Sequence, residues 1–231
     1  MRYLGSMLLT MLVAAVPAAS VLAAPPAVPP GLEFRHAGYF EVRHDMRKCP
    51  SPVCGGFWLK RVNQPFTVCA DGQKRAQCYV AELEGAPETL CEVDAAVLVR
   101  GSLRPRVYTG VGADGLNLGF FRVAAAWRAA APGAPEDVAP RRLHYAGIES
   151  SGIVCITTPC PSFTEYTLNS PRQRLLADVD LSPAGARPEV EQKALNVVAA
   201  GEVLLVRGLT REDEASGTLY FEARQFYLPV R

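Results

Sequence analysis

YFEVRHDMRKCPSPVCGGFWLKRVN, at residues 39–63, is followed 106 positions along the chain by YAGIESSGIVCITTPCPSFTEYTLN, at residues 145–169. The two stretches align without a gap and share five of 25 residues. Similarity at one fixed offset indicates an internal repeat, so we expect two tandem copies of one unit. The shared positions are Tyr39 and Tyr145, Cys49 and Cys155, Cys54 and Cys160, Phe57 and Phe163, and Asn63 and Asn169.

The alignment resumes after an insertion in the first copy. The further matching segments are VAELE (80–84) with LADVD (176–180), VLVRG (97–101) with LLVRG (204–208), and the aromatic residues 120–127 with 220–227.

These matches place the first repeat unit at residues 39–128 and the second at residues 143–231. Residues 129–142 are rich in Ala and Pro, a composition suited to a linker. Residues 1–23 are predicted to be a signal peptide, and residues 24–38 form a Pro-rich segment after it.

The leader prediction rests on three features of the N-terminus. Arg2 supplies a positive charge, residues 4–21 are almost wholly apolar or small, and Val21-Leu22-Ala23 fits a signal peptidase site. We therefore expect export to the periplasm or the outside of the cell, with no membrane span after cleavage.

The overall charge argues against nucleic acid as a partner. The chain has 24 Lys and Arg against 23 Asp and Glu, and cleavage of the leader removes Arg2. A balanced protein has no general positive field to hold a phosphate backbone.

The seven cysteines are predicted to form local disulfides, because exported chains oxidise their thiols. The second copy contains only Cys155 and Cys160, so these most simply pair with each other, and the equivalent pair is Cys49 with Cys54. Cys69 and Cys78 then close the inserted loop, and Cys91 is left over. The same spacings in an intracellular protein would suggest zinc; the leader favours disulfides, and we predict no metal and no cofactor.

The fold is predicted to be mainly β with a few short helices. Phe40 and Val42 alternate with polar residues, as in a strand with one buried face. Residues 188–201 carry apolar residues at helical spacing, with Pro188 suited to the first turn and Gly201 to the end. Each repeat is expected to be a small antiparallel sheet or barrel-like unit with one helix.

The cysteine-rich pattern resembles a family of uncharacterised exported bacterial proteins common in myxobacteria. The resemblance covers about residues 39–127, with a more distant second copy, and implies export and a shared fold unit but no function. The segments that carry it are residues 46–63, 69–72, 78–82, 98–101 and 118–121, and in the second copy residues 152–162.

Paired acidic residues recur in both copies and give one candidate site. Glu82 with Glu84, and Asp178 with Asp180, stand at i and i+2 of predicted strands and so lie on one side. Such pairs can bind Ca²⁺ or act as acid and base; on a plain structural interpretation they form a solvated face, or pair with the recurring Arg100 and Arg207.

The histidines give little support for catalysis. His36, His44 and His144 do not recur at matched positions, because His44 aligns with Ser150. No known catalytic string accompanies them, so we predict no catalytic residue.

The second candidate site is the Cys155 loop, defined here as residues 155–160; residues 49–54 form the Cys49 loop. Its residues Ile156, Thr157, Thr158 and Pro159 would be held between bridged cysteines, which reduces the freedom lost when a partner binds. Such a loop either supports the fold or contacts a partner.

The leading hypothesis is therefore an exported, non-enzymatic structural or binding module that recognises an unknown protein or polymer. One alternative is a protease inhibitor that presents the Cys155 loop. Another is a hydrolase that uses Asp178 and Asp180.

Overall fold

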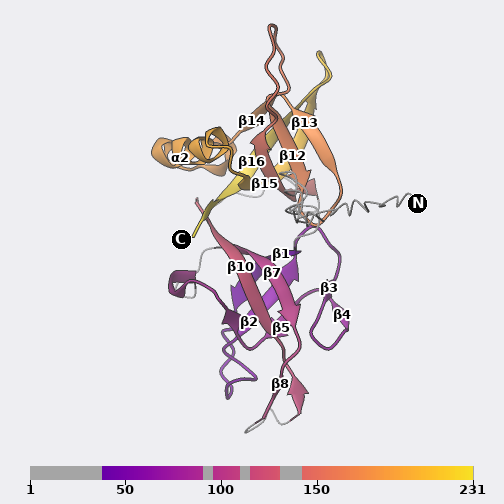
Figure 1. The fold of residues 1–231 in the computed structure, drawn as a ribbon, viewed down its shortest axis with the longest axis vertical. Coiled ribbons are helices and arrows are strands. Elements are labelled where there is room, and N and C mark those ends of the chain that lie inside the picture. Colours follow the sequence, from indigo (N-terminus) through magenta and orange to yellow (C-terminus); the bar gives the residue numbers. More distant parts are fainter. Residues whose placement is uncertain (1–37, 91–95, 110–114, 131–141, 231) are drawn as a thin grey trace, which may run out of the picture.

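Figure 1 shows a computed structural model that describes residues 38–90, 96–109, 115–130 and 142–230. The predicted signal peptide, residues 24–37 of the Pro-rich segment and Cys91 lie outside these residues, as does most of the predicted linker. The described chain is mainly β, as predicted, and its longest sheet is largely antiparallel. We call residues 38–130 the N-terminal half and residues 142–230 the C-terminal half.

The N-terminal half is built around β1 (Gly38–His44). Its neighbours are β2 (Phe57–Arg61) and β7 (Val97–Arg104), and β10 (Phe120–Ala129) lies beyond β7. Phe40 and Val42 point into an apolar core with Leu59 and Phe121, as their alternation predicts. Shorter elements complete this half: β3 (Thr67–Val68), β4 (Lys74–Arg75), β5 (Cys78–Val80), β6 (Leu83–Glu84), the 3-10 turn η1 (Glu88–Leu90), β8 (Val107–Tyr108) and β9 (Leu116–Asn117).

The C-terminal half has the same central order. The neighbours of β11 (His144–Ser150) are β12 (Phe163–Thr167) and β15 (Leu204–Asp213), and β16 (Thr218–Pro229) lies beyond β15. The sheet continues past β12 into β13 (Gln173–Leu176), while β14 (Asp178–Asp180) pairs parallel to β16.

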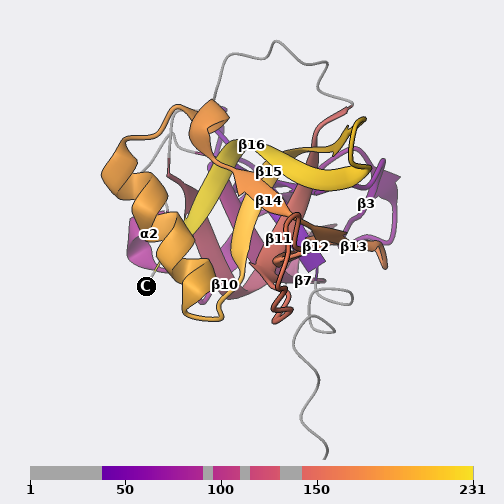
Figure 2. The ribbon, with the colours of Figure 1, turned by 90° about the horizontal axis from the view of Figure 1, so that it is seen from above.

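Helix α2 (Pro188–Ala199) is the one α-helix in the described residues. Pro188 opens it and Gly201 follows its end, as the sequence predicted. Glu189 and Glu191 lie in its first turn, at the positive end of the helix dipole. It follows the 3-10 turn η3 (Ser182–Ala184) and lies to one side of the strands in Figure 2, burying Ala194 and Val198 in the core. In the described part of the chain, no helix combines the length and the apolar character that crossing a bilayer requires.

The two halves share the same strand registers. Gly38 faces Gly101 where His144 faces Gly208, and Val42 faces Leu59 where Ile148 faces Glu165. Both glycines lie at a register shift. The pairing of β7 with β10 shifts next to Gly101, and the pairing of β15 with β16 shifts next to Gly208. A Cβ on Gly101 would lie 2.0 Å from the carbonyl oxygen of Arg122, and one on Gly208 would lie 2.1 Å from that of Glu222, so a side chain is excluded at both.

The halves meet in one continuous sheet. Trp127, Arg128 and Ala129 of β10 pair with residues 227–229 of β16, so the strand order runs from β13 through β16 and β10 to β5. Asn63 and Asn169 add hydrogen bonds across this joint. The buried joint cluster consists of Tyr39, Val62, Leu98, Leu168, Leu205 and Tyr227.

The molecule is elongated, with the joint at mid-height (Figure 1). The segment between β11 and β12 extends beyond the sheet at one end, next to the turn between β15 and β16. The segment between β1 and β2 extends toward the other end, where β8 also lies. Long loops are thus presented at opposite ends of the molecule.

Candidate binding site

Three disulfides join the pairs expected from the sequence. Cys49 bonds to Cys54 with 5.4 Å between their Cα atoms, and Cys155 bonds to Cys160 with 5.7 Å between theirs. Cys69 and Cys78 close the inserted loop. The two short rings interrupt equivalent hairpins, β1 to β2 and β11 to β12.

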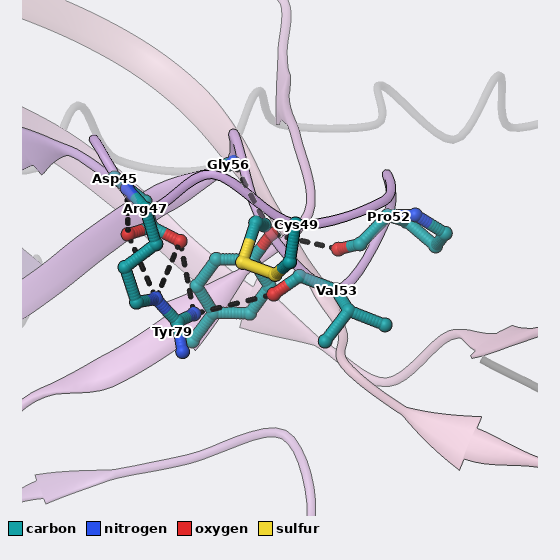
Figure 3. The surroundings of a disulfide bond; sticks show 8 residues. Asp45, Arg47, Cys49, Pro52, Val53, Gly56 and Tyr79 are labelled. Carbon is teal, nitrogen blue, oxygen red and sulfur yellow. Dashed lines mark hydrogen bonds and ion pairs between the residues drawn. A yellow bond between two sulfur atoms is a disulfide. The ribbon is translucent and has the colours of Figure 1, made fainter. Parts of the chain in front are cut away.

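The Cys49 loop is fastened to the sheet (Figure 3). Asp45 is 2% exposed and accepts hydrogen bonds from Arg47 at 2.9 to 3.2 Å, and Arg47 also donates to the Val53 carbonyl. The Tyr79 hydroxyl donates to the Pro52 carbonyl at 2.7 Å and accepts from the Gly56 N–H. The hydrogen bond from Arg47 is the main cause that lowers the pKa of Asp45. These contacts give the Cys49 loop a structural role.

The Cys155 loop lacks such fastening. Each hydrogen bond that the structure describes for residues 152–160 stays within residues 150–162, such as the Ile153 N–H to the Ser151 hydroxyl. Val154 is 95% exposed and Ile156 is fully exposed. Two large apolar side chains therefore stand in water on a cross-linked loop.

A hollow of about 1000 Å³ lies beside the Cys155 loop. Pro159 lines it from the loop, Asp178 and Asp180 from β14, and Leu195 from α2. The structure thus brings both sequence-predicted candidates, the loop and the second acidic pair, to one place. We call this space the acidic hollow, because the carboxylates that line it are Asp178, Asp180, Glu191, Glu212, Asp213 and Glu214.

These carboxylates are positioned by local backbone contacts. Asp178 accepts from the Val179 N–H at 2.8 Å, and Asp180 accepts from the Ser182 N–H at 2.9 Å. The Ser216 hydroxyl and the Ala215 N–H lower the pKa of Asp213. Asp178, Asp180 and Asp213 are all exposed to the solvent.

Positive charge in the acidic hollow is limited to Arg211 among the described residues that line it. The Arg211 Nε already donates to Glu222 at 2.6 Å. The space is therefore strongly negative, and an incoming cation would be attracted to it.

The structure places the acidic residues of the first copy beside arginines other than Arg100. Glu82 and Glu84 form ion pairs with Arg106, and Glu84 with Arg122 at 3.2 Å. β6 pairs with the edge of β10 opposite to β7, so Arg100 lies on a strand that β10 separates from them.

The same arrangement separates the second pair from its predicted arginine. β14, which carries Asp178 and Asp180, pairs with one edge of β16, and β15, which carries Arg207, pairs with the other. The guanidinium of Arg207 lies 5.8 Å from the ring centre of Tyr145. In both halves, the acidic pair and the recurring arginine therefore lie on strands that a third strand separates.

Among the described residues, no group of three His, Cys, Asp or Glu side chains is placed to hold a metal ion. His44 contacts the sulfur of Met46, His144 bonds to Glu165, and His36 lies outside the described residues.

Sequence reasoning missed part of this site. The acidic run Glu212, Asp213 and Glu214 between two strands was a readable signal of a negative turn. Glu191 lies within the predicted helix, and its place in the hollow depends on how α2 packs, which the sequence pattern does not show.

Comparison with known proteins gives a family and no activity. No curated protein matches the chain. A family model described as a domain of unknown function, DUF6748, matches residues 38–231, which includes both halves and the joint. The chain therefore belongs to the DUF6748 family.

Proposed function

We propose that this protein is an exported, non-enzymatic binding module in which the Cys155 loop and the acidic hollow together bind a basic segment of a protein partner. The observation that carries the proposal is the exposure of Ile156 in the Cys155 loop, and of Val154 directly before it, beside a negative hollow that Pro159 of the loop lines.

The loop is suited to binding because its cost of ordering is low. The ring closed by Cys155 and Cys160 restricts the backbone before a partner arrives, so less conformational entropy is lost on binding. Exposed aliphatic side chains gain free energy when a partner covers them.

Charge complementarity selects the class of partner. The acidic hollow attracts Lys or Arg side chains and repels acidic ones, while the exposed loop favours an apolar residue next to them. A protein segment that carries basic residues beside an apolar one satisfies both parts of the surface.

The matching registers of the two halves support an origin by tandem duplication. In this proposal the units are residues 39–128 and 143–231, joined by residues 129–142, and the protein is bacterial, of the myxobacterial type that the sequence resembles. The second unit keeps an unfastened loop for binding, while the first uses its equivalent loop for structure. The N-terminal leader and the three disulfides support export.

The proposal is tested with the purified mature protein on an array of short peptides of varied charge. Peptides that combine Lys or Arg with an aliphatic residue should bind, and their acidic counterparts should not. The double variants Val154→Ser with Ile156→Ser, and Asp178→Asn with Asp180→Asn, should each weaken binding at least tenfold. Val107→Ser is the matched control, because Val107 is 60% exposed on β8 at the far end of the molecule.

The array has outcomes that reject the proposal. Equal binding of acidic and basic peptides, or retention of binding in both double variants, would do so. Slowing of a protease that cleaves within residues 156–159 would replace it with the inhibitor hypothesis. Turnover of a substrate that stops in Asp178→Asn with Asp180→Asn would replace it with the hydrolase hypothesis.

A further inference from the structure

A buried carboxylate bonded to a histidine lies on β11 and β12, beneath a surface that shares Arg211 and Glu212 with the acidic hollow. The Glu165 side chain is 0% exposed, and one of its oxygens lies 2.7 Å from Nε2 of His144. The Thr210 hydroxyl donates to the other oxygen at 2.7 Å. Both oxygens of a carboxylate inside the core are thus bonded, and one partner, the His144 side chain, is 21% exposed.

The fold does not require this polar cluster. In the same registers of the N-terminal half, Gly38 stands for His144, Leu59 for Glu165, and Leu103 for Thr210. Leu59 is fully buried in an apolar core, so the strand pairing is satisfied without a charge. A buried carboxylate with its hydrogen-bond partners seldom stabilises a fold more than well-packed apolar residues of similar volume, so its presence in one half calls for another explanation.

Two hollows open over His144. One has a volume of about 370 Å³ and the other about 420 Å³. Arg142, His144 and Arg172 line both, which makes the two hollows adjacent parts of one concave surface. Arg174 lines the first and stands opposite Glu165 in the pairing of β12 with β13.

The charge of this surface is positive. In the described parts of the chain, no ion pair within 4.0 Å joins Arg142, Arg172 or Arg174 to a carboxylate, although Arg174 and the buried Glu165 attract each other electrostatically. Arg211 also lines the surface but bonds to Glu222, and Glu212 is the acidic residue at its margin.

The carboxylate beneath the surface stays ionised. Burial alone would raise the pKa of Glu165, but the hydrogen bonds from His144 and Thr210 outweigh burial and lower it. Glu165 therefore holds the His144 ring in place through its hydrogen bond to Nε2.

We propose that the hollow lined by Arg142, His144, Arg172 and Arg174 is an anion-binding site for a ligand that carries carboxylate or phosphate groups. Arginine guanidinium groups match both oxyanions geometrically, and Arg142, Arg172 and Arg174 bring three of them to this surface. Thr167 and Ser170 line the adjoining hollow of about 420 Å³, which shares Arg142, His144 and Arg172 with the first.

The test is isothermal titration of the mature protein with inorganic phosphate and, separately, with citrate, at constant ionic strength set by sodium chloride. We expect saturable binding of at least one of the two anions. Arg172→Gln and Arg174→Gln should each weaken it about tenfold, as expected for loss of one charge-assisted contact. Arg187→Gln, at the N-terminal boundary of α2 and exposed, is the matched control and should change nothing.

Each arm of the titration has a defined meaning. Binding of phosphate alone assigns a phosphate ligand, and binding of citrate alone assigns a carboxylate ligand. Absence of saturable binding, or equal binding by the wild type and both arginine variants, overturns the proposal. Val154→Ser with Ile156→Ser should retain anion binding, so failure of the peptide-binding proposal does not decide this one.

Discussion

Asn63 and Asn169 make the same three hydrogen bonds, each to the opposite half of the molecule. Asn63 accepts from the Tyr145 N–H at 2.8 Å and donates to the carbonyls of Tyr145 and Leu168. Asn169 accepts from the Tyr39 N–H at 3.0 Å and donates to the carbonyls of Tyr39 and Val62. Each asparagine side chain thus bonds to backbone groups of the other half, near the start of one strand and just after the end of the next.

Replacement of Asn169 should destabilise the joint. Asn169→Ala removes three hydrogen bonds at a buried site, and about 1 kcal/mol for each predicts a loss of about 3 kcal/mol. The free energy of unfolding in urea measures it. Asn169→Gly is the matched control: the φ of 58° favours glycine over alanine, so the glycine variant isolates the hydrogen bonds from backbone strain. A loss below about 1 kcal/mol in both variants would mean that the bonds contribute little.

A side chain at Gly208 should disrupt the pairing of β15 with β16. Gly208→Ala would place a methyl group 2.1 Å from the Glu222 carbonyl oxygen, and backbone cannot move aside cheaply. Overpacking of this kind predicts a loss of about 2 kcal/mol or more, and Gly101→Ala should behave alike. Thermal unfolding of the variants measures the effect. Ser102→Ala, next to Gly101 on β7, should stay within about 0.5 kcal/mol of the wild type.

Removal of the two short disulfides should affect their loops differently. The two cysteines of each ring are five positions apart, so the loop-entropy estimate of the stabilisation is about 2 kcal/mol for each ring. Cys155→Ser with Cys160→Ser should expose the Cys155 loop to proteolysis, because its remaining hydrogen bonds stay within its own stem. Cys49→Ser with Cys54→Ser should leave residues 49–54 protected, because Arg47 and Tyr79 still fasten them. Limited proteolysis with mass spectrometry distinguishes the cuts; equal cleavage of both loops would contradict the assigned roles.

Acid should destabilise the protein through Glu165. Its pKa in the folded protein lies below the ordinary value of 4.5, so its stabilising contribution is complete above that value. The contribution is lost as the pH falls through the folded pKa, because protonation removes the charge that His144 and Thr210 bond.

Urea unfolding from neutral pH to about pH 3 tests this, with Glu165→Gln as the comparison. The variant should be less stable than the wild type at neutral pH, and the difference should shrink at the acid end. A constant difference across the range would show that Glu165 does not account for the acid sensitivity. Asp45, whose pKa Arg47 lowers, acts in the same direction and remains in both proteins.

The parts of the fold that the sequence predicts are local or repeated. The alternation at Phe40 and Val42, the boundaries of α2 and the three cysteine pairs follow from short spacings. The ion-pair partners of Glu82 and Glu84 could not be predicted in this way, because they depend on which edge of β10 pairs with β6. The pairing of β10 with β16 also depends on how the halves meet, which no local pattern encodes.

The candidate site was predictable to a similar degree. The ring around Ile156 and the acidic pair at Asp178 were both visible, yet nothing in their spacing placed them beside one hollow. The contrast between Glu165 and Leu59 was present in the aligned stretches, where a charge replaces an aliphatic residue on a predicted strand. Its meaning depended on the burial of that strand and on His144 reaching it from β11.

The pairing of β10 with β16 determines how the molecule can be held. The described chain enters at β1, where the Tyr39 N–H bonds to Asn169, and leaves after β16, where the Val230 N–H bonds to the Ala126 carbonyl. Both points lie at the waist, while the long loops lie at the two poles (Figure 1). A tether attached at either point would therefore hold the molecule at its middle and leave the loops at both ends accessible to other molecules.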